Sequence, residues 1–177
     1  LSFDGNDYVA LPEQLSEDIG AVGSAATLTV HYKGTGAIFE GTEITAPIYP
    51  ILFRIEGLNS GNNFSSLKTY HRSADLSVNQ EPATEAISDD NIWNTLIISY
   101  DNQNGHYDLY HNGVLTISYD FEPSSFYADN MVWSIGRHPQ GIPSYFNGNL
   151  DNITLWNYAF TELDVWIFLS GNIMPQV

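Results

Sequence analysis

Acidic and amide side chains gather near both ends of the sequence. Asp4, Asn6 and Asp7 lie in a turn-rich segment close to the N-terminus, and Asp151 and Asn152 lie at the start of a strand near the C-terminus. Calcium takes six to eight oxygen ligands, supplied by carboxylates, carboxamides and carbonyls at turns. We expect these five residues to hold a structural calcium if the two terminal strands pair. The alternative is that each group forms Asx turns, in which side-chain oxygens accept hydrogen bonds from nearby backbone amides.

A second group of residues has the chemistry of a sugar site. Such a site needs a flat aromatic ring for the apolar face of the sugar and a few fixed polar groups for its hydroxyls. The candidate ligand-binding residues, all expected in loops, are Tyr49, Tyr70, His71, Arg72, Arg137, His138 and Tyr145. Arg72 and Arg137 could hold the carboxylate of a uronic acid or of a peptide terminus. The alternative for each Arg is a surface ion pair with one of the many acidic side chains.

The sequence has no recognisable catalytic arrangement. Glycoside hydrolysis uses two carboxylates that flank the scissile bond, but no Glu-x-Asp-x-x-Glu string is present, and Glu162 and Asp164 lack the third acid. There is no Gly-x-Ser-x-Gly segment for a Ser nucleophile. The chain has no Cys, which excludes disulfides, thiolate zinc sites and a Cys nucleophile. We therefore predict a noncatalytic protein.

The charge of the chain narrows the class of partner. Five Lys and Arg oppose 21 Asp and Glu, for a formal net charge of -16. Nucleic-acid binding requires clustered basic side chains, so it is excluded. An acidic chain of this kind suits salty, calcium-containing surroundings. No apolar run approaches the roughly 18 residues of a membrane helix, so we expect no membrane insertion. The sequence starts without Met, and we interpret it as one module of a longer extracellular, bacterial protein.

Short strands are the elements that must position these residues. The 177 residues fit one domain over 1–177, and the aromatic content of 14% suits half-buried pleated surfaces. We expect strands at 1–3, 8–11, 26–32, 37–40, 51–55, 67–70, 76–78, 92–100, 106–110, 114–119, 131–136 and 146–156.

Turn and cap residues predict the connections. A hairpin is expected across Gly34–Gly36, and others across 101–105 and at Asn112-Gly113. One short helix should begin after Thr161 and stop at Gly171. The four Trp residues fall in strand or helix patterns and are expected in the core. The pattern predicts an all-β, two-sheet antiparallel sandwich of the jelly-roll type with one short C-terminal helix.

Four fragments, taken in order, resemble the laminin-G-like modules of the concanavalin A-like superfamily. Leu1–Val9 resembles the family's first strand, in which an apolar-Phe-Asp-Gly segment runs into Asp-Tyr-Val. Trp93–Tyr100 and Tyr107–Gly113 resemble its Trp-led strand and its apolar-Tyr-x-Asn-Gly hairpin. Ser134–Arg137 and then Phe146–Thr161, with the following helix, resemble the end of the module.

The resemblance implies a concanavalin A-like sandwich that binds glycans or proteins at the cell exterior. Such modules often hold a structural calcium and are commonly appendages of adhesins or of carbohydrate-active enzymes. One departure is Asn152, which stands where the family has a second acidic residue and lowers the local charge. We therefore expect a noncatalytic glycan-binding module with a structural calcium. The alternatives are a peptide- or protein-binding domain of an adhesin, or a structural spacer.

Overall fold

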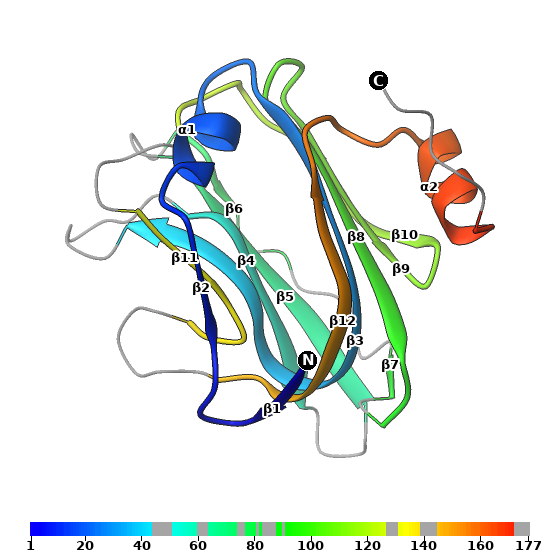
Figure 1. The fold of residues 1–177 in the computed structure, drawn as a ribbon. Coiled ribbons are helices and arrows are strands. Elements are labelled where there is room, and N and C mark those ends of the chain that lie inside the picture. The colour runs from blue at the N-terminus through cyan, green and yellow to red at the C-terminus, as the bar shows by residue number, and fades with distance from the viewer. Residues whose placement is uncertain are drawn as a thin grey trace.

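The computed structural model is a sandwich of two antiparallel sheets that share one strand (Figure 1). The predicted all-β sandwich is thereby confirmed. The structure describes residues 1–43, 51–59, 64–73, 77–80, 82, 88–89, 91–126, 131–138 and 145–171.

We name the sheets A and B. Sheet A contains, in spatial order, β1 (Ser2–Asp4), β12 (Asn147–Trp156), β3 (Ala25–Glu43), β8 (Asn94–Asp101), β9 (His106–His111) and β10 (Val114–Asp120). Sheet B contains β2 (Val9–Leu11), β11 (Met131–Ile135), the second half of β3, β4 (Ile51–Asn59) and β5 (Phe64–Arg72), with β6 (Asn79–Gln80) and β7 (Ser88–Asp89) paired to β5. The two helices are α1 (Leu15–Gly20) and α2 (Glu162–Leu169).

Strand β3 runs through both sheets without a turn, so the hairpin predicted across Gly34–Gly36 is wrong. The chain stays extended over all 19 residues, bends at the glycines, and passes from sheet A to sheet B. A Cβ atom at Gly34 or Gly36 would lie 2.1 Å from the carbonyl oxygen of Asn147 or Tyr145. The glycines therefore allow the segment at Tyr145–Asn147 to approach β3 closely, and they do not reverse the direction of the chain.

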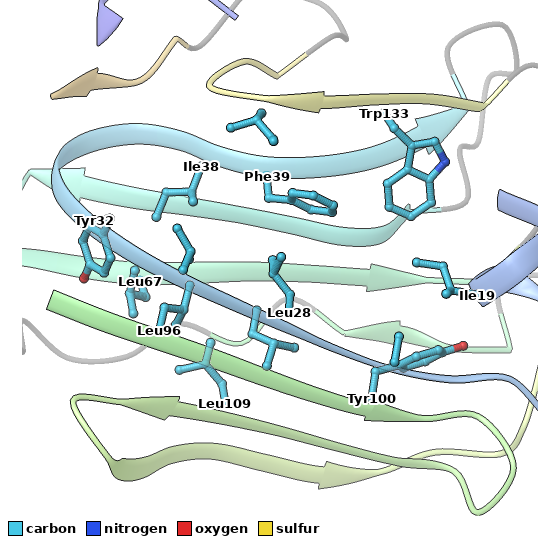
Figure 2. Close-up of a cluster of buried hydrophobic side chains, with 14 of the residues drawn as sticks. Ile19, Leu28, Tyr32, Ile38, Phe39, Leu67, Leu96, Tyr100, Leu109 and Trp133 are labelled. Carbon is cyan, nitrogen blue, oxygen red and sulfur yellow. The ribbon is translucent and has the colours of Figure 1, made fainter. Parts of the chain in front are cut away.

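The core fills the space between the two sheets (Figure 2). Leu28, Val30 and Tyr32 project from β3 at alternate positions and are buried, as expected for the inner face of a strand. Trp133 packs on Phe39 with a ring-centroid distance of 5.8 Å. The short helix α1, which the sequence did not indicate, lies near one end of this core.

Two other hairpins and the C-terminal helix form as predicted. The turn at Asn112-Gly113 has positive φ at both residues, which the Asn-Gly pair tolerates. Thr161 caps α2 in a capping box with Asp164. Gly171 follows the helix with a φ of 72°. Neither described helix has the length or apolar character needed to span a bilayer.

The C-terminal segment covers the outer face of sheet A, the face turned away from sheet B (Figure 1). Phe160 is buried in a second cluster with Ile97, Tyr110 and Val165. The Thr27 hydroxyl donates to the carbonyl of residue 158 and accepts from the Phe160 amide. These contacts bury polar positions of sheet A that would otherwise face water.

Candidate functional site

The outer face of sheet B carries a continuous row of paired residues across five strands. In this row Ala10 of β2 pairs with Ser134 of β11, and Ser134 pairs with Glu40 of β3. Glu40 pairs with Arg54 of β4, which pairs with Tyr70 of β5. With neighbouring strands about 4.8 Å apart, the row is roughly 19 Å long. This row and the chain that follows β11 form the candidate site.

A buried acid–histidine pair forms the floor of the site. Glu40 is fully buried, and His138 is only 8% exposed. The Nδ1 atom of His138 lies 2.6 Å from Oε2 of Glu40. A carboxylate partner makes Nδ1 the protonated ring nitrogen, so Nε2 is left as an acceptor in the neutral ring and as a donor in the charged ring.

Arg137 stands next to this floor with its guanidinium stacked on an aromatic ring. Its Cζ atom lies 3.7 Å from the centroid of the Tyr8 ring. Its carbonyl accepts a hydrogen bond from the Ser134 hydroxyl, and its backbone pairs with Tyr145 in an isolated bridge. The Arg137 Nε atom is buried and has no hydrogen-bond partner among the described residues. Stacking occupies the flat face of a guanidinium and leaves its edge donors free to meet an anion.

Strand β5 supplies the other side of the site. Tyr70 is half-buried, and the Lys68 ammonium lies 4.3 Å from the centroid of its ring. Arg72, two residues further along, donates from Nε to the Asn79 side-chain oxygen at 2.9 Å, which ties β5 to β6. Tyr70 therefore lies in a strand, in agreement with the strand expected at 67–70, and not in a loop. His71 and Arg72 continue the same strand, so the prediction that they are loop residues is wrong.

His71 points in the opposite direction and belongs to the core. Its ring stacks on Phe126 at a centroid distance of 4.1 Å, and its Nδ1 atom lies 3.1 Å from the Tyr119 hydroxyl. Burial lowers the pKa of His71 to about 3, because the charged ring would lose its hydration. His71 is thus a neutral core residue and cannot contact a ligand at the surface.

The structure therefore brings together part of the predicted sugar site. Tyr70, Arg137, His138 and Tyr145 all lie in or beside sheet B, and Tyr49 lies outside the described residues. Glu40 was not predictable as a site residue, because its contact with His138 joins residues 98 positions apart.

Basic residues are concentrated on the same sheet. Of the five Lys and Arg residues in the sequence, Lys33 lies in sheet A, in the first half of β3. Arg54, Lys68 and Arg72 lie in strands of sheet B, and Arg137 follows β11 of the same sheet. In a chain of net charge -16, this distribution gives sheet B the positive positions that an anionic ligand would need.

The terminal strands pair as predicted, but their register separates the two halves of the expected calcium site. Asp4 pairs with Asn147, whereas Asp151 lies four residues further along β12 and pairs with His31 of β3. Four residues of strand correspond to about 13 Å. The described side chains do not fit one calcium site shared by both groups, and no group of three acidic or His side chains among them could hold a metal.

The acidic groups near the termini instead make local contacts. Asp4 Oδ1 accepts from the Asn6 amide, as in an Asx turn, and Asp7 Oδ2 accepts from the Asp4 amide. The Asn152 side-chain amide lies 3.2 Å from Nδ1 of His31. Asn152 has a φ of 49° and sits where the pairing of β12 with β3 is interrupted. Asn tolerates this left-handed conformation better than most residues.

Two of the four Trp residues are exposed, contrary to the prediction that all lie in the core. Trp133 is fully buried, but Trp93 is 52% and Trp166 is 63% exposed. Trp166 lies on α2, whose apolar residues are not confined to the side that packs on sheet A.

Sequence and fold together define the family. Residues 3–165 match the family described as the concanavalin A-like lectin/glucanases superfamily, through a laminin-G domain profile. The chain belongs to this family. A comparison with curated proteins finds no match.

Several solved structures share the fold. The leech intramolecular trans-sialidase, in complex with 2,7-anhydro-Neu5Ac, is 18% identical, with a TM-score of 0.72 over 99% of this chain and 27% of that chain. The Ruminococcus gnavus IT-sialidase CBM40 bound to α2,3-sialyllactose is 12% identical, with a TM-score of 0.72 over 96% of this chain and 95% of that one. Domain 4 of AbnA, an extracellular arabinanase from Geobacillus stearothermophilus, in complex with arabinotriose, is 22% identical, with a TM-score of 0.62 over 93% of this chain and 73% of that one. The chain thus spans about a quarter of the leech enzyme but nearly all of the CBM40 domain.

Proposed function

We propose that this protein is a noncatalytic glycan-binding module that recognises an acidic sugar on the outer face of sheet B. The observation that carries the proposal is the Arg137 guanidinium, stacked on Tyr8 beside the buried Glu40–His138 pair. Similar structures in complex with sialyllactose and arabinotriose support a glycan as the ligand.

Each group has a separate part in binding. Arg137 pairs through its free edge donors with the carboxylate of a sialic or uronic acid, in the bidentate geometry typical of Arg. Tyr70 offers a half-buried ring for the apolar face of a sugar, about two strand spacings from Glu40. Glu40 fixes the orientation of His138, so that its Nε2 atom is preorganised for a sugar hydroxyl.

Binding without catalysis fits this chemistry. Hydrolysis of a glycosidic bond requires an acid and a second carboxylate on opposite sides of the bond. In the described part of the candidate site, Glu40 is buried against His138 rather than free to reach a substrate. We infer that the module acts outside the cell, as a binding appendage of a larger protein.

A titration tests the proposal. Isothermal titration calorimetry with α2,3-sialyllactose, a glucuronate-containing disaccharide and neutral lactose should show saturable binding of at least one acidic sugar and weaker binding of lactose. The change Arg137→Gln should weaken binding about 10- to 100-fold, because a charge-assisted hydrogen bond contributes about 1.5–3 kcal/mol.

The matched control is Lys33→Gln, which removes the same charge from sheet A and should leave the affinity within about twofold. Equal losses in both variants would mean that overall charge, rather than a site, attracts the sugar. Binding of peptide carboxylates in place of sugars would favour the adhesin alternative.

Calcium remains a separate prediction for the turn at Asp4–Asp7. This turn supplies two carboxylates and one carboxamide, so carbonyls and water would have to complete the six to eight oxygens. Thermal unfolding with EDTA and with added calcium tests it. A rise of several degrees with calcium would indicate a metal site in the folded state, and no rise would leave an ordinary Asx turn.

A further inference from the structure

Two adjoining cavities form a groove on the outer face of sheet A, between α2 and the β9–β10 hairpin. Their volumes are about 420 and 250 Å3. Both are lined by Tyr110, Leu115 and Glu162, so they are parts of one depression, which we call the α2 groove.

One end of the α2 groove is apolar and open to solvent. Trp166 is 63% exposed, Leu115 48% and Leu169 42%, and all three line this end. A short amphipathic helix normally turns its apolar side toward the protein, and large apolar patches left in water mark interaction surfaces.

The other end of the α2 groove is acidic. Asp101, Asp108 and Glu162 line it, and none of the described lining residues is Lys or Arg. His106 lies between two carboxylates, with Nε2 3.1 Å from Asp108 and Nδ1 2.6 Å from Asp120. One His among four carboxylates leaves this end negatively charged.

We propose that the α2 groove is a docking surface for a segment of another protein that carries Lys or Arg side chains beside bulky apolar ones. The acidic end complements the basic groups, and the apolar end accepts the neighbouring side chains. The exposed ring of Trp166 can also hold a cation on its face. This surface lies on the opposite side of the sandwich from the sugar site.

The charge distribution argues against two other occupants. A second copy of this chain would bring another -16 of net charge to an acidic groove. An anionic lipid surface would be repelled by the same carboxylates. A basic and apolar segment of a different protein fits both ends.

Fluorescence anisotropy with labelled six-residue peptides tests the proposal on the whole chain. The probe alternates Lys and Leu, and two control peptides carry Glu in place of Lys or Ser in place of Leu. Only the Lys–Leu peptide should bind. The groove variants Trp166→Ala and Glu162→Gln should each weaken its binding at least tenfold, with unchanged circular dichroism.

The matched controls lie outside the groove. Leu163→Ala removes an equally exposed apolar residue from the same helix, and Glu13→Gln removes an exposed acid near α1. Both should bind the Lys–Leu peptide like the unmodified protein. The proposal is overturned if the controls lose as much affinity as the groove variants, if all three peptides bind equally, or if none binds. Dimers in sedimentation equilibrium that dissociate in Trp166→Ala, or binding to anionic vesicles that depends on Trp166, would equally overturn it.

Discussion

The outer faces of the two sheets differ in both covering and charge. The face of sheet A is closed by residues 157–171, which bury apolar side chains on it and leave an acidic groove at the edge. The face of sheet B carries Tyr70 and Arg137 in partly exposed positions above a buried Glu40–His138 pair. The outer face of sheet A thus buries apolar side chains beneath the C-terminal segment, whereas the outer face of sheet B leaves Tyr70 and Arg137 partly exposed, as expected when a fold serves as a scaffold for sites that vary.

The largest loss of stability is expected when a side chain that packs the C-terminal segment on sheet A is truncated. Phe160→Ala removes a ring that is 4% exposed at the centre of the second cluster. Truncation of a buried Phe costs about 3–5 kcal/mol of unfolding free energy. Urea denaturation should show this loss, whereas binding of an acidic sugar to the folded variant should be unchanged.

The matched change on sheet B is Tyr70→Ala. It should cost about 1 kcal/mol of stability or less, because the ring is only half-buried, yet it should abolish or strongly weaken sugar binding. If Phe160→Ala proved as mild as Tyr70→Ala, the contrast between a covered face of sheet A and an open, sugar-binding face of sheet B would be wrong.

The next largest effect is the dependence of stability on pH caused by His71, a neutral side chain of β5 that points into the core. Its pKa is lowered from 6.5 to about 3 by burial, so below pH 6.5 the unfolded chain binds a proton that the folded chain does not. Stability should therefore fall as the pH falls, by about 3 kcal/mol between pH 6.5 and about pH 4.

A double variant isolates this contribution. His71→Phe with Tyr119→Phe removes the titrating ring and its hydroxyl partner together, so neither polar group is left buried alone. The dependence of unfolding free energy on pH, measured in urea from pH 7 to 4, should become correspondingly flatter. An unchanged slope would show that His71 is not the group that titrates.

A smaller effect should follow loss of the helix cap that holds α2 on sheet A. The Thr161 hydroxyl accepts from the Asp164 amide, and the Asp164 side chain accepts from the Thr161 amide. Thr161→Ala should cost about 1 kcal/mol in urea denaturation. Thr161→Ser keeps the hydroxyl and should recover most of that loss, and an equal loss in both variants would argue against capping as the cause.

The smallest change in stability is expected from His106 on sheet A, whose pKa is shifted in the opposite direction to that of His71. The hydrogen bond to Asp120 raises the pKa of His106, so its contribution to stability is present below pH 6.5 and disappears as the pH rises through its folded-state pKa. His106→Asn should therefore destabilise the protein at pH 5.5 and have little effect at pH 8.5. Thermal melting at both pH values checks this, and equal destabilisation at both would contradict it.

The sequence predicted local features better than long-range ones. The hairpin at Asn112-Gly113 and the cap at Thr161 were predictable because a few adjacent residues determine them. The course of β3 was not predictable. A glycine such as Gly34 is expected both in a turn and in a strand that a neighbouring segment approaches closely, so its presence does not distinguish the two. The burial of His71 in the core was also unpredictable. The alternation of side chains along a strand defines two faces but does not show which one is buried.

The candidate site shows the same limit. Arg137 and His138 could be selected by residue type in a chain with few basic side chains. Glu40 could not be selected, because its partner is brought to it only by the pairing of β3 with β11. The two groups of residues predicted to share a calcium lie apart for a related reason: the pairing of the termini was predictable, but its register was not.

The most direct test of acidic-sugar recognition is a map of the bound sugar on the protein by heteronuclear NMR, with amide shifts followed during titration with an acidic oligosaccharide such as sialyllactose. We expect saturable shifts at Tyr70, Arg137 and His138, and little change in α2. Shifts confined to the α2 groove, or shifts that do not saturate, would contradict the assignment of sheet B as the sugar-binding face.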